Sequence, residues 1–247
     1  MRVGLVSVGD ELLAGDTVNT NAAWLGSRLA ERGASVERCV VVPDRIETIA
    51  TVVDELHDRY DAVLVTGGLG PTHDDLTMDA VARAFDRDLE ASDEAIEWLA
   101  ERGGYERADL AAGTADLPAG ARVLHNEAGV APGCVVESVY VFPGVPEEMH
   151  AMFETVAGEF SGTVSHVEWV HAAEPESGLL DRIAAVRERF DVTVGSYPGE
   201  HVRLKVQSDD AETATAAAAW LTERVDLAEP ADGDDESSEA GERPVEE

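Results

Sequence analysis

The chain has 247 residues, a length sufficient for one α/β core and a small second domain. It carries 51 acidic against 18 basic residues, and Lys205 is its single lysine. This balance argues against nucleic acids and anionic membranes as partners, since both require basic surface, and it is typical of a protein that stays in solution at high salt.

The first half of the chain alternates apolar strands with amphipathic helices. In chain order we expect strands over residues 3–8, 35–42 and 62–65, and helices over residues 19–32, 46–56 and 76–85. Gly33 is placed to end the first of these helices. Strand–helix–strand alternation with short connections predicts a three-layer α/β/α fold with a mostly parallel sheet.

The second half is less regular. We expect a polar helical stretch over residues 93–118, short strands over 123–125, 134–137 and 139–142, and a helix that begins at Pro146. A composition break at residues 158–162 predicts that the main domain covers residues 1–160. A small β-α-β-β-α domain should follow over 161–225, with a hairpin turn at Ser196-Tyr197-Pro198-Gly199. Residues 226–247 contain ten acidic side chains and one basic one, which predicts a disordered tail.

A glycine-rich loop between Val65 and Asp79 carries the clearest chemical signal. It follows an apolar strand directly and reads Val-Thr-Gly-Gly-Leu-Gly-Pro-Thr-His-Asp-Asp-Leu-Thr-Met-Asp. Glycines at a strand end let backbone N–H groups approach a phosphate, because no Cβ intervenes. The neighbouring carboxylates would repel that phosphate unless a cation lies between them. The loop therefore predicts a phosphate-bearing ligand together with a divalent metal, for which Mg²⁺ is the candidate.

Further carboxylates follow the other strands. Asp10 and Glu11 come after the first strand, Asp44 after the second, and Asp75 lies in the glycine-rich loop. In an open parallel sheet, ligands bind outside the carboxyl ends of the strands where the strand order reverses. A strand order of 2-1-3 would bring all four carboxylates to one crevice.

Each carboxylate also has a purely structural explanation. Asp44-Arg45-Ile46-Glu47 has the form of a capping box, so Asp44 could simply cap the helix that follows. Asp75 or Thr77 could cap the next helix in the same way, and Asp10-Glu11 could be an ordinary polar turn. Three glycines within four positions are harder to explain by a turn alone.

The remaining signals concern the two cysteines and the cellular location of the protein. Cys39 and Cys134 show no metal or redox spacing and lie in apolar runs, so we expect buried free thiols. The chain enters a strand pattern at its first residues, and no apolar run is long enough to span a membrane. We therefore expect a cytoplasmic protein.

Several motifs together resemble one known family. They are Gly9-Asp10-Glu11-Leu12-Leu13-x-Gly15 with Asn19 and Asn21, Thr66-Gly67-Gly68-Leu69-Gly70-Pro71-Thr72-x-Asp74-Asp75-Leu76-Thr77, Asn126-x-x-Gly129-x-Ala131-Pro132-Gly133, Phe142-Pro143-Gly144-Val145-Pro146-x-Glu148-Met149 and Ser196-Tyr197-Pro198. The set is similar to the molybdopterin-binding (MoaB/Mog-like) domain. More narrowly, it resembles the N-terminal part of the competence/damage-inducible protein A (CinA) family, over residues 1–225.

The resemblance implies roles for individual residues. Gly67, Gly68 and Gly70 would cradle phosphate, Thr72 and Thr77 would donate hydrogen bonds, and Asp74 or Asp75 would hold Mg²⁺. Asp44 and Asp75 would be the catalytic carboxylates, with Asp44 orienting water or the metal. The remaining residues that we assign to nucleotide or phosphate binding are Gly9, Asp10, Glu11, Asn19, Thr66, Pro71, Pro143 and Gly144.

Three functions are compatible with these residues. The first is Mg²⁺-dependent hydrolysis of the pyrophosphate of ADP-ribose-like nucleotides, which the CinA branch implies. The second is adenylyl transfer to molybdopterin, and the third is a nucleotide-binding regulatory module without turnover. Many family members carry a C-terminal amidohydrolase domain, to which the resemblance does not extend. The small domain resembles a KH-like module but lacks the Gly-x-x-Gly phosphate clamp. The family also suggests self-association.

Overall fold

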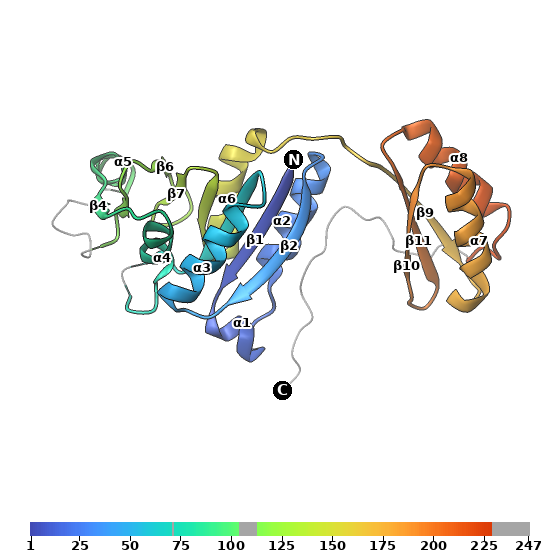
Figure 1. Cartoon of the computed structure of the whole chain (residues 1–247), viewed down its shortest axis with the longest axis horizontal. Helices are drawn as coiled ribbons and strands as arrows, with labels where there is room; N and C mark the ends of the chain where they lie inside the picture. The colour runs from blue at the N-terminus through green and yellow to red at the C-terminus, as the bar shows by residue number, and fades with distance from the viewer. Residues whose placement is uncertain (71, 104–112, 229–247) are drawn as a thin grey trace. The chain divides into compact units, whose positions relative to one another are not determined.

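The fold was obtained as a computed structural model that describes residues 1–70, 72–103 and 113–228. The chain divides into two compact units, Met1–Val164 and Ser165–Glu247 (Figure 1). The division falls four residues after the domain boundary that the composition break suggested.

The first unit alternates strands and helices as far as α4. Its elements are β1 (Arg2–Val8), α1 (Asp10–Ala14), α2 (Thr20–Glu31), β2 (Ser35–Val42), α3 (Ile46–His57), β3 (Ala62–Gly67), α4 (Thr77–Ala84), β4 (Leu89–Ala91), α5 (Asp93–Gly103), β5 (Asp116–Pro118), β6 (Arg122–Leu124), β7 (Gly133–Val136), β8 (Val139–Pro143), α6 (Pro146–Val156) and the 3₁₀ turn η1 (Ala157–Glu159).

One six-stranded sheet, ordered β2-β1-β3-β8-β7-β6, organises this unit. Pairing is parallel among β2, β1, β3 and β8 and antiparallel between β8 and β7 and between β7 and β6. The predicted mostly parallel sheet and its 2-1-3 strand order are confirmed. The carboxyl ends of four neighbouring strands therefore lie at one edge of the sheet.

Helices cover both faces of this sheet, as Figure 1 shows. The alternation within β3 illustrates the reason: Ala62 and Leu64 pack into a core with α2 and α6, whereas Val63 and Val65 pack into a second core with α3 and α4. Successive side chains of a strand point to opposite faces, so a fully apolar strand needs a helical layer on each side. The three-layer α/β/α architecture follows.

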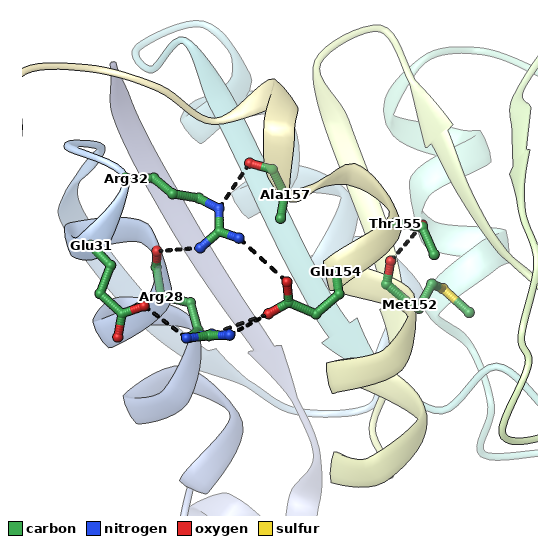
Figure 2. Close-up of polar contacts among 7 residues, drawn as sticks. All are labelled: Arg28, Glu31, Arg32, Met152, Glu154, Thr155 and Ala157. Atoms are coloured by element: carbon green, nitrogen blue, oxygen red, sulfur yellow. Dashed lines mark hydrogen bonds and ion pairs between the residues drawn. The ribbon is translucent and has the colours of Figure 1, made fainter. Parts of the chain in front are cut away.

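Ion pairs join α2 to α6 across the surface of the first layer (Figure 2). Arg28 donates to Glu154 from Nε and Nη2 at 3.1 and 2.8 Å, and Arg32 contacts the other oxygen of Glu154 at 3.3 Å. Glu154, with Glu31 as a further contributor, raises the pKa of the Arg28 guanidinium above its usual value. Two of the few basic residues in this acidic chain thus form ion pairs that connect two helices.

The second unit has the predicted β-α-β-β-α order. Its elements are β9 (His166–Ala172), α7 (Glu176–Arg189), β10 (Thr193–Tyr197), β11 (Val202–Ser208) and α8 (Ala211–Thr222). The antiparallel sheet is ordered β10-β11-β9. Side chains such as Val170, Leu204 and Leu179 are buried between this sheet and its helices, and α7 and α8 lie on the same side of the strands (Figure 1).

Several boundaries differ from the sequence predictions. The helix expected over 93–118 ends at Gly103 as far as the structure describes it; residues 104–112 lie outside the described residues, and Asp116–Pro118 is a strand paired with β4, which the sequence analysis missed. Helix α1 was also missed, because its five residues are too few to show a periodicity.

Two errors concern the second unit. Ser196 and Tyr197 belong to β10 and pair with β11, so the hairpin turn follows them instead of including them. The tail does not begin at residue 226, since Leu227 bridges Ala172 and the Ala228 N–H donates to the His171 carbonyl at 3.0 Å. The rest of the predicted tail, residues 229–247, lies outside the described residues.

Both cysteines are free thiols, but only Cys134 is buried. Cys39 is exposed because β2 is an edge strand whose alternate side chains face solvent, so the prediction of burial was wrong there. Within the described ranges, no helix combines the length and apolar character that crossing a bilayer would require.

Candidate functional site

A cavity of about 720 Å³ opens at the carboxyl ends of the parallel strands. Its lining includes Gly9 after β1, the 67–70 loop at the end of β3, and Gly144 after β8. Asp44, which follows β2, completes the contribution of all four parallel strands. This is the crevice that the topology rule for open α/β sheets predicts.

Carboxylates dominate the polar lining of this cavity. Five acidic side chains contribute, and no lysine, arginine or histidine is found among the described lining residues. The five are Glu11, Asp44, Asp74, Asp75 and Glu148. An anionic ligand can enter such a site only with a cation, because the unscreened repulsion between like charges at short range is large.

The 67–70 loop offers hydrogen-bond donors to the cavity. The backbone N–H groups of Gly68, Leu69 and Gly70 donate to no residue in the described part of the chain. Backbone donors must find a partner, so these groups are left to bind water or a ligand. An array of successive N–H groups of this kind suits phosphate oxygens.

Asp74 and Asp75 share one hydroxyl donor. The Thr72 side chain lies 2.7 Å from Asp74 Oδ1 and within hydrogen-bond distance of Asp75 Oδ2, and the Thr72 N–H donates to Asp75 at 3.0 Å. The hydroxyl bond from Thr72 lowers the pKa of Asp74 below its ordinary value. A hydroxyl has one hydrogen and can serve only one carboxylate at a time. The pair therefore keeps uncompensated negative charge.

Asp44 does not cap α3. The residue at the N-terminal cap of that helix is Arg45, which forms no capping side-chain bond. Asp44 Oδ2 instead accepts the N–H of Asp10, the first residue of α1, at 2.8 Å. The capping-box interpretation was therefore wrong: the carboxylate turns toward the cavity edge because α1 supplies an unsatisfied N–H there.

The glycines make room for carboxylates. A Cβ on Gly68 would collide with Asp75 Oδ1, and one on Gly70 would lie 2.7 Å from Asp75 Oδ2. A Cβ on Gly129 would likewise collide with the Glu148 carboxylate. None of the three has a left-handed φ, so their backbone conformation is open to any residue. What these positions require is space, and much of that space is filled by the acidic side chains themselves.

Glu148 and Asn126 were not predicted as site residues. The buried Asn126 amide donates to Glu148 at 2.6 Å and to the Ala131 carbonyl at 2.9 Å, while its oxygen accepts the Gly129 N–H at 2.8 Å. Asn126 thus holds both the 129–131 wall of the cavity and a carboxylate on α6. Both residues lie in motifs that carried the family resemblance, which was the signal available for finding them.

Other predicted residues lie beside the cavity instead of lining it. Asn19 and Thr66 border a smaller cavity of about 100 Å³ that shares Val8, Glu11 and Gly144 with the main one. Asn19 also caps α2 by accepting the Ala22 N–H at 3.1 Å.

The last predicted residues have supporting positions. Asp10 offers its N–H to Asp44. Thr77 is buried, its hydroxyl faces Gly67 and lacks a partner among the described residues, and it does not cap α4, which begins without a side-chain cap. Pro71 lies outside the described residues. Gly9, Glu11, Gly67, Gly68, Gly70, Pro143 and Gly144 all line the cavity, and their role in binding phosphate or nucleotide stays a prediction.

The described residues contain no group of three His, Cys, Asp or Glu side chains arranged to hold a metal ion. Magnesium does not require one, since it is commonly bound by one or two carboxylates together with substrate phosphates and water. The Asp74–Asp75 pair, with one shared hydroxyl donor, provides oxygen ligands of that kind. These residues therefore fit a magnesium ion that arrives with its phosphate ligand.

Known proteins resemble this chain along most of its length. A family model described as "Probable molybdopterin binding domain" matches residues 4–161. A protein of Archaeoglobus fulgidus is 39% identical over 214 residues, 86% of this chain and 93% of that protein. A CinA-like protein of Citrifermentans bemidjiense is 39% identical over 244 residues, which are 91% of this chain and 58% of that protein. Among solved structures, the protein CinA from Thermoplasma acidophilum gives a TM-score of 0.60 at 33% identity, over 66% of this chain and 100% of that one.

Proposed function

The chain belongs to the molybdopterin-binding domain family and is CinA-like within it, and from that premise we propose that it hydrolyses the pyrophosphate of ADP-ribose-like nucleotides with Mg²⁺. The chain spans little more than half of the CinA-like protein of Citrifermentans bemidjiense, so the proposal concerns the activity of this cavity alone.

One observation carries the proposal. Five carboxylates line the same cavity as three successive backbone N–H groups that have no partner in the described part of the chain, and no basic side chain is found among the described lining residues. A phosphoanhydride needs donors for its oxygens and a cation for its charge, and the cavity supplies the donors together with ligands for the cation. Its volume of about 720 Å³ lies in the range of small-molecule sites.

The residues of the chain suggest a division of labour. The N–H groups of Gly68, Leu69 and Gly70 would bind phosphate oxygens, and Asp74 and Asp75 would hold the metal. Bound magnesium would neutralise phosphate charge and make phosphorus more electrophilic. Asp44 has one oxygen engaged by the Asp10 N–H and the other without a partner in the described chain. That free oxygen would orient the water and accept its proton as the P–O bond breaks, giving AMP and ribose 5-phosphate.

The experiment compares two Asp→Asn variants on neighbouring positions. Asp75→Asn removes a cavity carboxylate, whereas Asp79→Asn makes the same change on an exposed residue of α4 outside this cavity. With ADP-ribose, Mg²⁺ and high salt, release of AMP should fall by about 100-fold in Asp75→Asn and stay unchanged in Asp79→Asn. Addition of a chelator should abolish the wild-type activity.

Other results would redirect the assignment. Wild-type protein that binds ADP-ribose but leaves it intact for hours with Mg²⁺ would make the cavity a binding module. Transfer of AMP from ATP to molybdopterin, without hydrolysis of ADP-ribose, would make it an adenylyltransferase. Full activity in Asp75→Asn would refute the role of the Asp74–Asp75 pair.

A further inference from the structure

The second unit has a sheet face that its helices do not cover. Residues directly opposite one another in the three strands form three rows on this face: His171–Arg203–Tyr197, Trp169–Lys205–Gly195 and Val167–Gln207–Thr193. The intervening residues, such as Val170 and Leu204, point into the core beneath α7 and α8. We call these nine positions the open face.

The charge of the open face is opposite to that of the chain. Arg203 and Lys205 lie on it, with His171 beside Arg203, and none of its nine positions is acidic. Glu168 is the single carboxylate of β9, β10 and β11, and it lies on the other face, where it accepts a hydrogen bond from Thr215 at 3.0 Å. The only lysine of the chain, Lys205, makes no side-chain ion pair with any described residue.

Two aromatic rings lie among these cations. Trp169 is 37% exposed and Tyr197 is 44% exposed, and their ring centroids are 5.5 Å apart. The Arg203 guanidinium lies 5.4 Å from the Trp169 ring centroid. Both residues bury more than half of their surface, and the part of each ring that stays exposed leaves apolar surface beside the two cations.

We propose that the open face binds single-stranded nucleic acid, with bases stacked on Trp169 and Tyr197 and phosphates at Arg203 and Lys205. Aromatic rings on an exposed sheet offer a surface for unpaired bases, and interleaved cations follow the backbone. A duplex hides its base faces and would bind poorly. The face is three strands wide, which favours a strand of several nucleotides over one free nucleotide.

The net charge of −33 opposes this binding, and the acidic Asp226 lies just beside the end of β9, where the Ala173 N–H donates to the Asp226 carbonyl at 2.7 Å. At about 1 M salt the Debye length is about 3 Å, so carboxylates elsewhere on the molecule are screened from a strand on the open face. Stacking does not depend on charge and persists under these conditions. With at most two permanent cations meeting phosphate, the slope of log K against log salt should be shallow, no steeper than about −1.4.

The test uses the full chain and a fluorescently labelled single strand of about ten nucleotides, read by anisotropy at several salt concentrations. Wild type should bind the single strand at least tenfold more tightly than the matching duplex. Trp169→Ala should weaken binding at all salt concentrations, and Trp169→Phe should restore most of it. Lys205→Glu should weaken binding mainly at lower salt.

A matched control variant separates the effect of charge on the open face from the effect of the overall charge on affinity. Arg187→Glu makes a comparable charge change on the exposed surface of α7, away from the open face, and should leave affinity within twofold of wild type. Circular dichroism confirms folding of each variant, and Lys205→Glu covers the case in which Trp169→Ala fails to fold. Absence of binding by wild type, equal affinity for duplex, or equal losses in Arg187→Glu and Lys205→Glu would overturn the proposal. So would self-association of the chain that buries Trp169.

Discussion

The cavity of the first unit and the open face of the second are each built where neighbouring strands bring side chains together, yet their charges are opposite. In the cavity, carboxylates come from loops and helix ends that follow parallel strands, and glycines give them room. On the open face, cations and aromatic rings come from alternate positions within antiparallel strands. Carboxyl ends gather loop residues, whereas a ladder gathers every second strand residue.

This difference separates the two kinds of chemistry that an acidic chain can support. A carboxylate cavity recruits a cation and handles an anion only through it, whereas a basic face meets an anion directly. The total charge of the chain predicts the local charge of neither region, because the topology places a few charged residues in each. The largest effects of substitution are expected in the acidic region, and the smallest at the basic residues of the first unit.

The largest effect is expected from Gly68→Ala. The new Cβ would meet Asp75 Oδ1 and force that carboxylate out of its position, although the backbone conformation itself tolerates alanine. If the glycine exists to seat Asp75, ADP-ribose hydrolysis should fall by about 100-fold while the melting temperature changes little.

Gly26→Ala is the matched control for that change. An added Cβ at Gly26 meets nothing within 4 Å, and the residue lies inside α2. Alanine there should leave hydrolysis unchanged and stabilise the fold by about 0.5–1 kcal/mol. Normal activity in Gly68→Ala would show that Asp75 can move without consequence, and the idea of glycines seating carboxylates would then be wrong.

Asn126→Ala should have an intermediate effect, visible in stability as well as in activity. Removal of the buried amide leaves the Gly129 N–H, the Ala131 carbonyl and Glu148 without their partner. Each buried polar group left unpaired is costly, so the free energy of unfolding should fall by about 1–3 kcal/mol in a denaturant titration.

Asn126→Asp distinguishes the two parts of that role. The aspartate keeps an acceptor for Gly129 but places a second carboxylate against Glu148. Stability at neutral pH should therefore fall further than in the alanine variant, because the two negative charges repel each other at short range. A loss equal to that of the alanine variant would mean that Glu148 takes no part in the network.

The sequence predicts the framework of this site better than its details. The continuous apolar run of β3 and the strand–helix alternation were readable, so the crevice at the strand ends followed from topology. The partner of Asp44 was not, because a capping box and a long-range bond to α1 have the same local sequence. The cluster around Asn126 joins residues 22 positions apart, a relation that no local pattern records. The open face was likewise hidden, since it required the register of β9, β10 and β11.

The smallest effect is expected at the basic residues of the first unit. These residues form structural ion pairs, whereas we propose that those of the open face bind phosphate. Glu154→Gln removes the carboxylate that holds Arg28 and Arg32 across α2 and α6 (Figure 2). These side chains are partly exposed, so their ion pairs contribute little and are screened by salt. The melting temperature should fall slightly at low salt and match that of wild type at molar salt. Glu147→Gln, on the same helix and without an ion pair to a described residue, should leave the melting temperature unchanged at both salt concentrations. A salt-independent loss in Glu154→Gln would instead assign the stabilisation to the contacts of the Arg28 and Arg32 guanidinium groups with the Trp24 and Phe153 rings.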